Sequence, residues 1–392
     1  MAMSFEKANP TEIGERLKIA RESTKLTQSE VASELKMART TLVAIEQGQR
    51  RARIDEVQSL ARLYKTSVNA IFRDEAVHVD LIPRFRKLTN GVDAVENAAN
   101  LLSSLVAAEV ELENMLGIRR SQNPPPERPI LPGDVRAQAE QDALELRQWF
   151  GLGSSPISDI TSLLELEIGA RVYIRRLDAK ISGLYAYDSE VGACILLNAN
   201  HPRERRSHTA AHELGHLVST RRAPDIFTMG EIENSREERY ANVFARSLLT
   251  PARALMQKFH EITSGATKIT CRHIIILSYF FGVSREAIVR RLEELKLVKA
   301  GTWDWFEDNG SITDDQVREV LGDRLALDMS AADAGRPTSF RLSMLAEQAW
   351  KKGLLSEGQL ARMLHIDRVE LRRTFDELAA EGGELDGSML HT

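Results

Sequence analysis

Several features that would place a chain in a specialised class are scarce in this sequence. Its two cysteines, Cys194 and Cys271, are too few for a disulfide framework. The longest near-continuous apolar run covers residues 274–281, far short of the roughly 20 residues that cross a bilayer. The first twenty residues carry three glutamates and lack an apolar core followed by a small-residue cleavage site. We therefore expect a soluble protein of the reducing cytoplasm without a membrane partner.

An excess of charge of one sign is also missing. The 392 residues include 52 Lys and Arg against 57 Asp and Glu, a net charge of −5. A hydrophobic fraction of 43% with 28% charged residues is ordinary for a globular protein and excludes a mostly disordered chain. At about 150 residues per domain, the length predicts two or three domains.

Prolines are concentrated in one place, with five of them between residues 124 and 132. Proline has no amide proton and disfavours helix in the residue before it, so this segment predicts a stiff, extended linker and a domain boundary. We expect a helical unit over residues 1–75 and a helical connector with the proline-rich linker over residues 76–135. A third part covers residues 136–300, and a helical C-terminal region covers residues 301–392.

The third part mixes strand and helix patterns. Runs rich in Val, Ile, Leu and Tyr predict short strands over residues 171–175, 183–187 and 193–198. Helical patterns cover residues 137–150, 203–219 and 235–249. The fold class is therefore α+β and mostly helical. An all-α N-terminal domain precedes a domain with a small sheet, and a helical region closes the chain.

A helix–turn–helix pattern lies near the N-terminus. Residues 28–35 read as a short helix capped by Thr27, with Glu30 at the capping-box position, and a second helix covers residues 38–46. The second helix of such a unit can enter the major groove of DNA. We expect Arg39, Thr40 and Thr41 to be exposed toward the DNA, while Leu42 and Ile45 face the core.

Local charge supports DNA contact. Residues 36–53 carry five basic side chains against one glutamate, a net charge of +4 in an acidic protein. Basic groups near a recognition helix are what phosphate contacts require. The alternative is a three-helix packing module that touches a protein.

Matching residues continue on both sides of this pattern, in Ile13-Gly14-Glu15-Arg16-Leu17, Leu26-Thr27-Gln28, Ile45-Glu46-Gln47-Gly48, Leu60-Ala61 and Val68. With them, about sixty residues resemble the Xre/Cro-type helix–turn–helix family. The resemblance implies a five-helix DNA-binding domain in which Gln28 and the residues from Arg39 to Thr41 approach DNA. It also implies that Arg16 and Glu46 pair. Ala38 stands where that family usually has a Ser or Thr cap, which costs the recognition helix about 1 kcal/mol.

The segment 210–217 contains the pattern H-E-x-x-H. On a helix, His212 and His216 share a face and can both point an imidazole at one cation, while Glu213 can reach a water on it. Neutral imidazole suits zinc, and an open fourth position lowers the pKa of the bound water to about 7. The alternative is two surface histidines, but the surrounding stretch is too apolar for a solvated face. Gly215 allows another backbone to come close.

A zinc site of this kind needs a third protein ligand. Glu238 shares a helix face with small and apolar residues, which makes it either a costly buried charge or a ligand. Glu237 lies on the neighbouring row, so periodicity does not separate the two. The downstream candidates are Asp225, Glu231, Glu233, Glu237 and Glu238.

A longer pattern surrounds these residues: Ile195-Leu196-Leu197-Asn198, Arg205, His212-Glu213-Leu214-Gly215-His216, Glu238-Arg239-Tyr240-Ala241-Asn242-Val243-Phe244-Ala245 and Leu248-Leu249-Thr250-Pro251. Over roughly residues 140–300 the chain resembles the ImmA/IrrE family of metallopeptidases. The resemblance implies a zincin-like peptidase domain with Glu238 as the third ligand. Tyr240 replaces an acidic residue common in that family, and we expect it to affect surface chemistry rather than the metal.

The ligand set predicts a mechanism. Zinc on His212, His216 and Glu238 would polarise a water and the scissile carbonyl. Glu213 would take the proton of that water and return it to the leaving amine. A donor for the oxyanion should exist, and the sequence leaves His208, Tyr185 and Tyr240 open.

Two helical segments remain. Residues 354–361 show another helix–turn–helix rhythm, for which we expect a packing or partner-binding role rather than DNA contact. Leucines of the helix over residues 92–117 approach heptad spacing over fewer than four heptads, which favours an intramolecular helix. Xre-type readers commonly act as dimers, so we also expect that a homodimer can form.

Three functions compete. The first is a DNA-binding zinc endopeptidase that cleaves a specific regulatory protein, such as a repressor, to control a stress, phage or mobile-element response. The second is a transcriptional regulator or antitoxin of a toxin–antitoxin or phage-defence locus, whose metal domain binds a partner with little proteolysis. The third, nonspecific degradation, fits poorly with a DNA-reading module. Glu213 favours the enzyme, because a structural zinc needs no general base.

Overall fold

The contacts of the chain divide it into two units, Met1–His78 and Val79–Thr392. The computed structural model describes residues 9–24, 26–64, 66, 71, 81, 93–223, 225–228, 235–265, 268–322 and 339–388, without side-chain detail for 225–228 and 381–388. The division does not fall at the proline-rich segment, where we expected a domain boundary. No helix in this described part of the chain has the length and apolar character to cross a bilayer.

The N-terminal unit contains helices α1 (Pro10–Ser23), α2 (Gln28–Glu34), α3 (Arg39–Glu46) and α4 (Ile54–Leu63). A capping box joins Thr27 and Glu30 at the start of α2, as the sequence predicts. Leu42 and Ile45 are buried in the core of this unit. Ala38 occupies the N-cap of α3 and, as an alanine, offers no side-chain acceptor. The fifth helix that the resemblance implies would fall outside the described residues.

A buried ion pair holds α1 to α3, but it is not the one that we expected. Arg21 Nε donates to Glu46 Oε1 over 2.7 Å, and Arg21 Nη2 donates to Glu46 Oε2 over 3.1 Å. Arg16 instead lies 3.5 Å from Glu12 and donates to the carbonyl oxygen of Ile71. The prediction of an Arg16–Glu46 pair is therefore wrong. Both arginines lie on α1, and the one further along the helix reaches Glu46.

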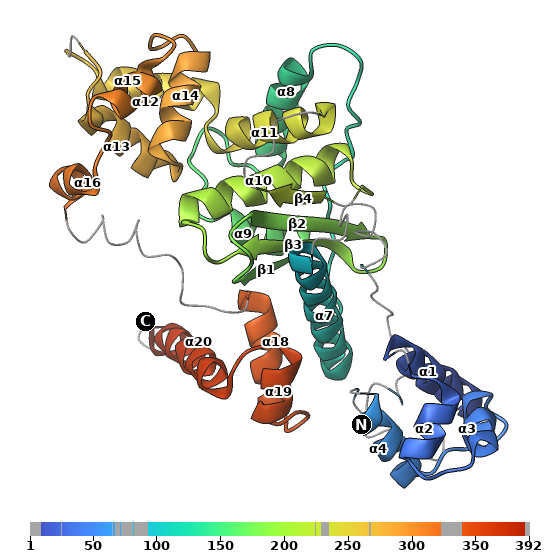
Figure 1. Cartoon of the computed structure of the whole chain (residues 1–392). Helices are drawn as coiled ribbons and strands as arrows, with labels where there is room; N and C mark the ends of the chain where they lie inside the picture. Colours follow the sequence, from blue (N-terminus) through green and yellow to red (C-terminus); the bar gives the residue numbers. More distant parts are fainter. Residues whose placement is uncertain are drawn as a thin grey trace. The chain divides into compact units, whose positions relative to one another are not determined.

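A four-stranded sheet lies at the centre of the second unit, in the order β1-β3-β2-β4 (Figure 1). Strands β1 (Arg171–Arg175) and β3 (Gly192–Asn198) run parallel, while β2 (Ile181–Asp188) is antiparallel to β3 and to β4 (Asp225–Thr228). The first three strands match the prediction. The short β4 was missed, because four residues carry too little pattern.

Helices cover both faces of this sheet (Figure 1). Ile195 and Leu197 belong to a core that includes residues of α10 (Arg203–Ser219). On the opposite face, Arg171 and Tyr173 of β1 bond to α7 (Asp93–Leu116). Because side chains alternate across a strand, β3, which is buried at every position, is apolar on both faces except for Asn198 at its end. The mostly helical α+β class predicted from the sequence is confirmed.

Further helices pack around this centre: α8 (Val135–Trp149), α9 (Ile160–Leu163), the π-helix η2 (Leu164–Ile168), α11 (Arg236–Leu249), α12 (Ala252–Ile262), α13 (Cys271–Phe281), α14 (Arg285–Glu294), α15 (Thr302–Asp308) and α16 (Asp314–Leu321). Phe306 and Ile312 join the same core as α10. The expected C-terminal region thus begins with residues that complete the sheet-containing unit. It ends in α18 (Phe340–Lys351), α19 (Glu357–Met363) and α20 (Arg368–Ser388).

The proline-rich segment lies along the second unit. The Asn123 amide donates to the carbonyl of Ile168 over 2.9 Å, and the Arg128 amide donates to the carbonyl of Val218 over 2.7 Å. Arg221 also bonds to the carbonyl of Pro125. The expected extended conformation remains, but the segment is bound at its backbone instead of separating two bodies. The backbone amides of the non-proline residues and the carbonyl of Pro125 provide those bonds.

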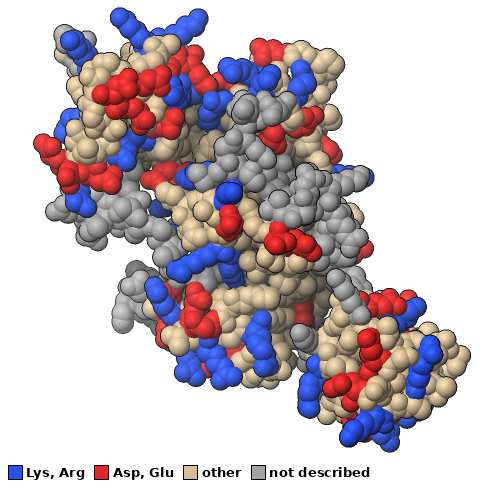
Figure 2. All heavy atoms as spheres, in the orientation of Figure 1, with Lys and Arg blue, Asp and Glu red and all other residues tan. Residues whose placement is uncertain are grey.

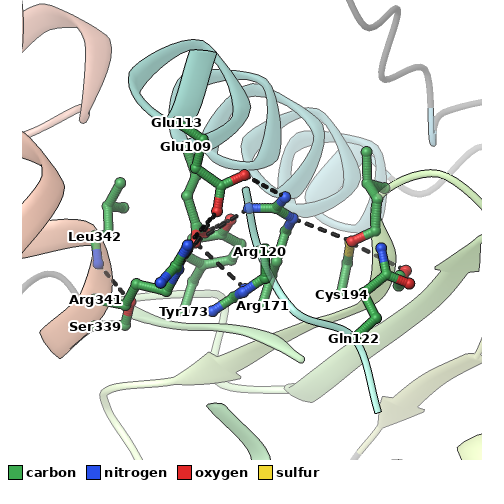
Figure 3. A network of polar contacts seen from close by, with 12 residues as sticks. Glu109, Glu113, Arg120, Gln122, Arg171, Tyr173, Cys194, Ser339, Arg341 and Leu342 are labelled. Carbon is green, nitrogen blue, oxygen red and sulfur yellow. Dashed lines mark hydrogen bonds and ion pairs between the residues drawn. The ribbon is translucent and has the colours of Figure 1, made fainter. Parts of the chain in front are cut away.

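A buried network of ions connects α7 with β1 (Figure 3). Arg171 lies 3.1 Å from Glu109 and 2.7 Å from Glu113, and Tyr173 donates to Glu109 over 2.6 Å. Burial alone would raise the pKa of Glu109, but Arg120, Arg171 and the Tyr173 hydroxyl outweigh it, and the pKa is lowered. The carboxylate therefore stays ionised inside the protein.

The same network reaches the C-terminal helices. Arg341 of α18 lies 3.0 Å from Glu113 (Figure 3). One cluster of opposite charges thus holds the connector helix, the sheet and α18 together. Because each of these charged groups is buried away from water, the oppositely charged groups around it must compensate for its lost hydration.

Removing one cation from this network should destabilise the second unit strongly. Arg171→Met leaves buried carboxylates undercompensated, and we expect a loss of about 3–5 kcal/mol in the free energy of unfolding. Urea unfolding followed by tryptophan fluorescence measures it selectively, because all four tryptophans lie within residues 79–392. As a control, Arg290→Met removes partly exposed ion pairs and should cost about 0–1 kcal/mol. Equal losses for the two variants would contradict a structural role for the network.

Candidate metal centre

Two helices carry the predicted site residues, α10 and α11. Helix α10 begins after Pro202, whose fixed backbone angle suits a helix start. Helix α11 is capped by Ser235, whose hydroxyl accepts from the Glu238 amide over 3.0 Å, and Pro251 lies just past its end. The cap and the stop fix which residues of α11 turn toward α10.

The two helices come unusually close at Gly215. A Cβ atom built there would lie 3.0 Å from the Cα of Ala241 and 3.3 Å from the Ala241 Cβ. The expectation that Gly215 admits another backbone is therefore confirmed. Small residues on both helices set their separation, and this separation allows a side chain of α11 to reach the histidines of α10.

Three side chains converge at this crossing. His212 Nε2 lies 3.1 Å from His216 Nε2, and Glu238 has a carboxylate oxygen 3.4 Å from each of these nitrogens. The possible ligand atoms of the three residues all lie within 4.8 Å of one another. Burial alone would raise the pKa of Glu238, but hydrogen bonds to the two imidazoles outweigh it and hold that pKa below its usual value. Two imidazoles and one carboxylate form a donor set suited to a divalent transition metal.

Both imidazoles are oriented by a second contact. His212 Nδ1 lies 3.1 Å from Asn242 Oδ1, and His216 Nδ1 lies 3.1 Å from Thr220 Oγ1. A partner at Nδ1 leaves Nε2 to face a cation, which is the arrangement that metal-binding histidines require. Analysis of the sequence missed these two roles. The spacing from His216 to Thr220 could have suggested one of them, since residues four apart on a helix are neighbours.

The structure separates the glutamates that periodicity could not. Glu238 faces the histidines, whereas the neighbouring Glu237 is exposed. Glu231 and Glu233 lie outside the described residues, and the side chain of Asp225 is not described. Glu238 is therefore the carboxylate that the fold brings to the histidines.

Glu213 is buried beside this group, against strand β2. A Cβ atom built on Gly183 would lie 3.2 Å from Glu213 Oε1 and 2.6 Å from Thr209 Cγ2. Strand β2 therefore needs a residue without a side chain where α10 presses Glu213 and Thr209 onto it. No pattern in the sequence indicates this role of Gly183.

Two of the three candidate oxyanion donors are engaged elsewhere. The Tyr185 hydroxyl donates to the carbonyl of Arg221 over 2.7 Å, and the Tyr240 hydroxyl donates to Asp142 Oδ2 over 2.8 Å. Tyr240 is fully buried, so the expectation that it affects surface chemistry is wrong. Its hydroxyl instead connects α11 to α8.

A cavity of about 750 Å³ opens one helical turn before His212, at His208. Burial, and then the charges of His212, Arg246 and Arg205, lower the pKa of His208 to about 3, so its imidazole is neutral at pH 7. The cavity is lined by residues of α10, α11, α13, α14 and α16, with four arginines among them. A space of this size is typical of ligand sites in proteins.

The predicted DNA-contacting residues lie on the N-terminal unit. Arg39 and Thr40 are exposed at the start of α3, and Thr41 is half-buried beside them. Gln28 is partly committed to the fold, because its amide nitrogen donates to Glu46 over 2.8 Å. Basic and acidic side chains are interleaved on the face of the molecule shown in Figure 2. Arg50 is 3.0 Å from Glu56, so part of the expected positive charge is compensated.

Two segments of the chain match known families. Residues 12–71 match a family described as a helix-turn-helix domain, and residues 166–293 match one described as an IrrE N-terminal-like domain of the M78 peptidases. The chain therefore combines a segment that matches a helix-turn-helix domain with a following segment that matches the M78 peptidase family. Both resemblances predicted from the sequence are confirmed.

Similarity to other proteins is otherwise weak. No curated protein matches the chain. PlcR of Bacillus thuringiensis, solved with the peptide PapR7 and DNA, is 12% identical over 97% of this chain and 100% of its own, with a TM-score of 0.17. Apo ComR of Streptococcus vestibularis is 12% identical over 96% of this chain and 99% of its own, also with a TM-score of 0.17. Similarities this weak say nothing about the fold or function of this chain.

The ligand assignment predicts how metal content responds to substitution. Glu238→Ala removes one of the three donors. We therefore expect the zinc bound per chain, after dialysis at limiting zinc, to fall by tenfold or more. Inductively coupled plasma mass spectrometry measures this metal content. Glu237→Ala is a matched control, because it removes the adjacent exposed carboxylate and should leave the metal content unchanged. If Glu237→Ala loses the metal and Glu238→Ala keeps it, the assignment is wrong.

Proposed function

We propose that this chain is a DNA-binding, zinc-dependent endopeptidase of the cytoplasm that cleaves a specific regulatory protein. The observation that carries the proposal is the convergence of His212, His216 and Glu238, with Glu213 buried beside them. This group lies within the segment that matches the M78 peptidases. A structural zinc site is closed by four protein ligands, whereas three ligands leave a position for water.

The three ligand residues are suited to zinc because neutral imidazole and carboxylate are donors that zinc accepts. Bound zinc would act as a Lewis acid on a water molecule and on the scissile carbonyl. Asn242 and Thr220 hold the imidazoles at their far nitrogens, which keeps the nitrogens at the site available. Gly215 keeps α11 close enough for Glu238 to complete the set.

Glu213 acts as the general base and then as the general acid. Its carboxylate is buried between α10 and β2, so it can accept the proton of the attacking water and deliver it to the leaving amine without competition from bulk solvent. Gly183 lies against it, and Thr209 packs on the same glycine. His208 lies one helical turn before His212 and lines the cavity, and it is the group that we assign to the oxyanion.

The cavity at His208 provides a place for the substrate chain. Arginines predominate among its charged lining residues, although Arg285 lies 3.2 Å from Asp314 and Arg246 lies 2.8 Å from Glu294. An acidic segment of a substrate therefore fits this cavity better than a basic one. A defined, charged recognition cavity also favours a narrow range of substrates over general degradation.

The DNA-binding domain gives the peptidase a location. A repressor bound near the same operator would meet the active site at a raised effective concentration, without any new contact between the proteins. A repressor or a toxin encoded beside this gene is the substrate that we propose. A homodimer would double the DNA contacts, as in many helix–turn–helix readers.

Glu213→Gln separates catalysis from metal binding. The amide is nearly the same size but cannot take a proton, so we expect zinc content to stay at the wild-type level and cleavage of the neighbouring repressor or toxin to fall by at least a hundredfold. The control Glu237→Gln changes an exposed glutamate and should cut at the wild-type rate. Cleavage retained by Glu213→Gln would refute the mechanism. Zinc without cleavage in the wild type would favour the regulator or antitoxin function.

Arg39→Ala tests the DNA-reading helix. Loss of an exposed guanidinium at the start of α3 should weaken operator binding by roughly tenfold, while peptidase activity stays unchanged. Titration of a labelled operator at several salt concentrations measures the affinity and its salt dependence. Arg62→Ala, at the exposed end of α4, is the control and should bind like the wild type. If both variants bind like the wild type, another surface reads the operator.

A further inference from the structure

Residues 356–375 repeat the local geometry of the first helix–turn–helix unit. Helices α2 and α19 each have seven residues and each begins with a capping box, Thr27 with Glu30 and Ser356 with Gln359. In both units another helix precedes this pair, α1 in the first and α18 in the second. The second unit lies in the region where the sequence showed a helix–turn–helix rhythm.

The two turns between the helices are the same. Lys36 and His365 each adopt a left-handed backbone conformation, with φ angles of 51° and 53°. One residue later, an amide donates back to an alanine carbonyl of the preceding helix over 3.0 Å in both units. Residues other than glycine rarely adopt this conformation, so its recurrence at the same position marks one turn type.

The helices that follow the turns also correspond. Helix α3 begins at Arg39 and α20 begins at Arg368, each at the same distance from its turn. Burial follows the same order along the two units, as in the pairs Val31 and Leu360, Ala32 and Ala361, and Leu42 and Leu371. The faces that pack inward therefore coincide, and the faces that remain outside coincide as well.

Three exposed arginines lie on the outer face at the start of α20, and two of them are in ion pairs. Arg368 is exposed, and the side chains of Arg372 and Arg373 are 66% and 65% exposed. Arg372 lies 2.8 Å from Glu357, and Arg373 lies 3.0 Å from Glu377. Val369 is 79% exposed among them, in the position that Thr40 holds on α3. Figure 2 shows basic side chains over this group of helices, with acidic ones between them.

We propose that α18–α20 form a second DNA-binding unit, in which the first turns of α20 enter the major groove. Arg368 and Arg372 then face the base edges, and the Val369 methyl groups fit the methyl group of a thymine. Arg373 lies beside them, where a phosphate can be reached. Glu370, in the first turn of α20, is half-buried, whereas Asp376 and Glu377 come later on the helix, where Glu377 pairs with Arg373 beyond the part of a recognition helix that contacts bases. This replaces the packing or partner-binding role that we expected from the sequence.

Duplex DNA explains this face better than a protein partner does. A protein-binding surface is centred on a fully apolar patch in which charged residues are depleted. Here an exposed valine lies among three exposed arginines and the glutamates that pair with two of them, and the geometry of the unit is that of the domain that matches a helix-turn-helix family. Arginines around the methyl groups of one valine suit a DNA groove, whose edges are lined by phosphates.

The test uses the full chain with the first reader weakened by Arg39→Ala, and a labelled pool of 40-base-pair duplexes of random sequence. The Arg39→Ala protein is the parent, and the duplexes that it selects from the pool are the ligand. Adding Arg368→Ala and Arg372→Ala to this parent should weaken its binding to those duplexes by roughly tenfold or more. Adding Val369→Glu instead should weaken the binding by as much, because the new carboxylate repels phosphates. The matched control carries Arg136→Ala and Arg318→Ala, which remove two exposed arginines from α8 and α16. It should bind like its parent.

Hydroxyl-radical footprints give an independent readout. The protein with both readers intact should protect two separate segments of a selected duplex, and the Arg368→Ala, Arg372→Ala variant should protect one. Fluorescence of Trp350, whose ring stacks on Phe375 at 5.3 Å, reports whether the unit is still folded. Unchanged affinity and an unchanged footprint in folded variants would overturn the proposal. So would a Val369→Glu variant that binds DNA normally but no longer binds the protein substrate.

Discussion

The close approach of α10 and α11 is the constraint on which the rest of the site depends. Gly215 has no side chain, so Ala241 can lie against the backbone of α10. At this separation Glu238 reaches both His212 and His216, although it lies far from them in the sequence. A larger residue at position 215 would push α11 away and leave two histidines without their carboxylate. The metal-binding property therefore belongs to the pair of helices rather than to the H-E-x-x-H segment.

The surrounding structure keeps this pair in place. Tyr240 connects α11 to α8 through Asp142. On the sheet, Gly183 has no side chain and therefore leaves room on β2 for Glu213 of α10. On the far face of the sheet, buried ions connect β1 to α7 and α18 (Figure 3). Such ions need mutual compensation, and they define one arrangement of helices on the sheet. The two helices that carry the site therefore pack on a sheet that makes stabilising contacts with helices on both of its faces.

Patterns within one element could be predicted from the sequence, and contacts between elements could not. The two histidines, Glu213, three strands and the capped helix at Thr27 follow from local spacing. Glu237 and Glu238 differ by one position, so only the packing of α11 distinguishes them. The expected Arg16–Glu46 pair failed for a similar reason, because Arg21 lies on the same helix and reaches Glu46 first. Tyr240 and the proline-rich segment were misjudged because their partners come from remote parts of the chain.

The most direct test of the central claim is X-ray absorption at the zinc edge, measured on the full chain loaded with one equivalent of zinc. We expect two imidazole nitrogens and carboxylate and water oxygens at about 2.0–2.2 Å, in a four-coordinate site. Water in the fourth position would support a catalytic centre built from α10 and α11. A spectrum with sulfur at about 2.3 Å, or with a single imidazole, would contradict the assignment of His212, His216 and Glu238.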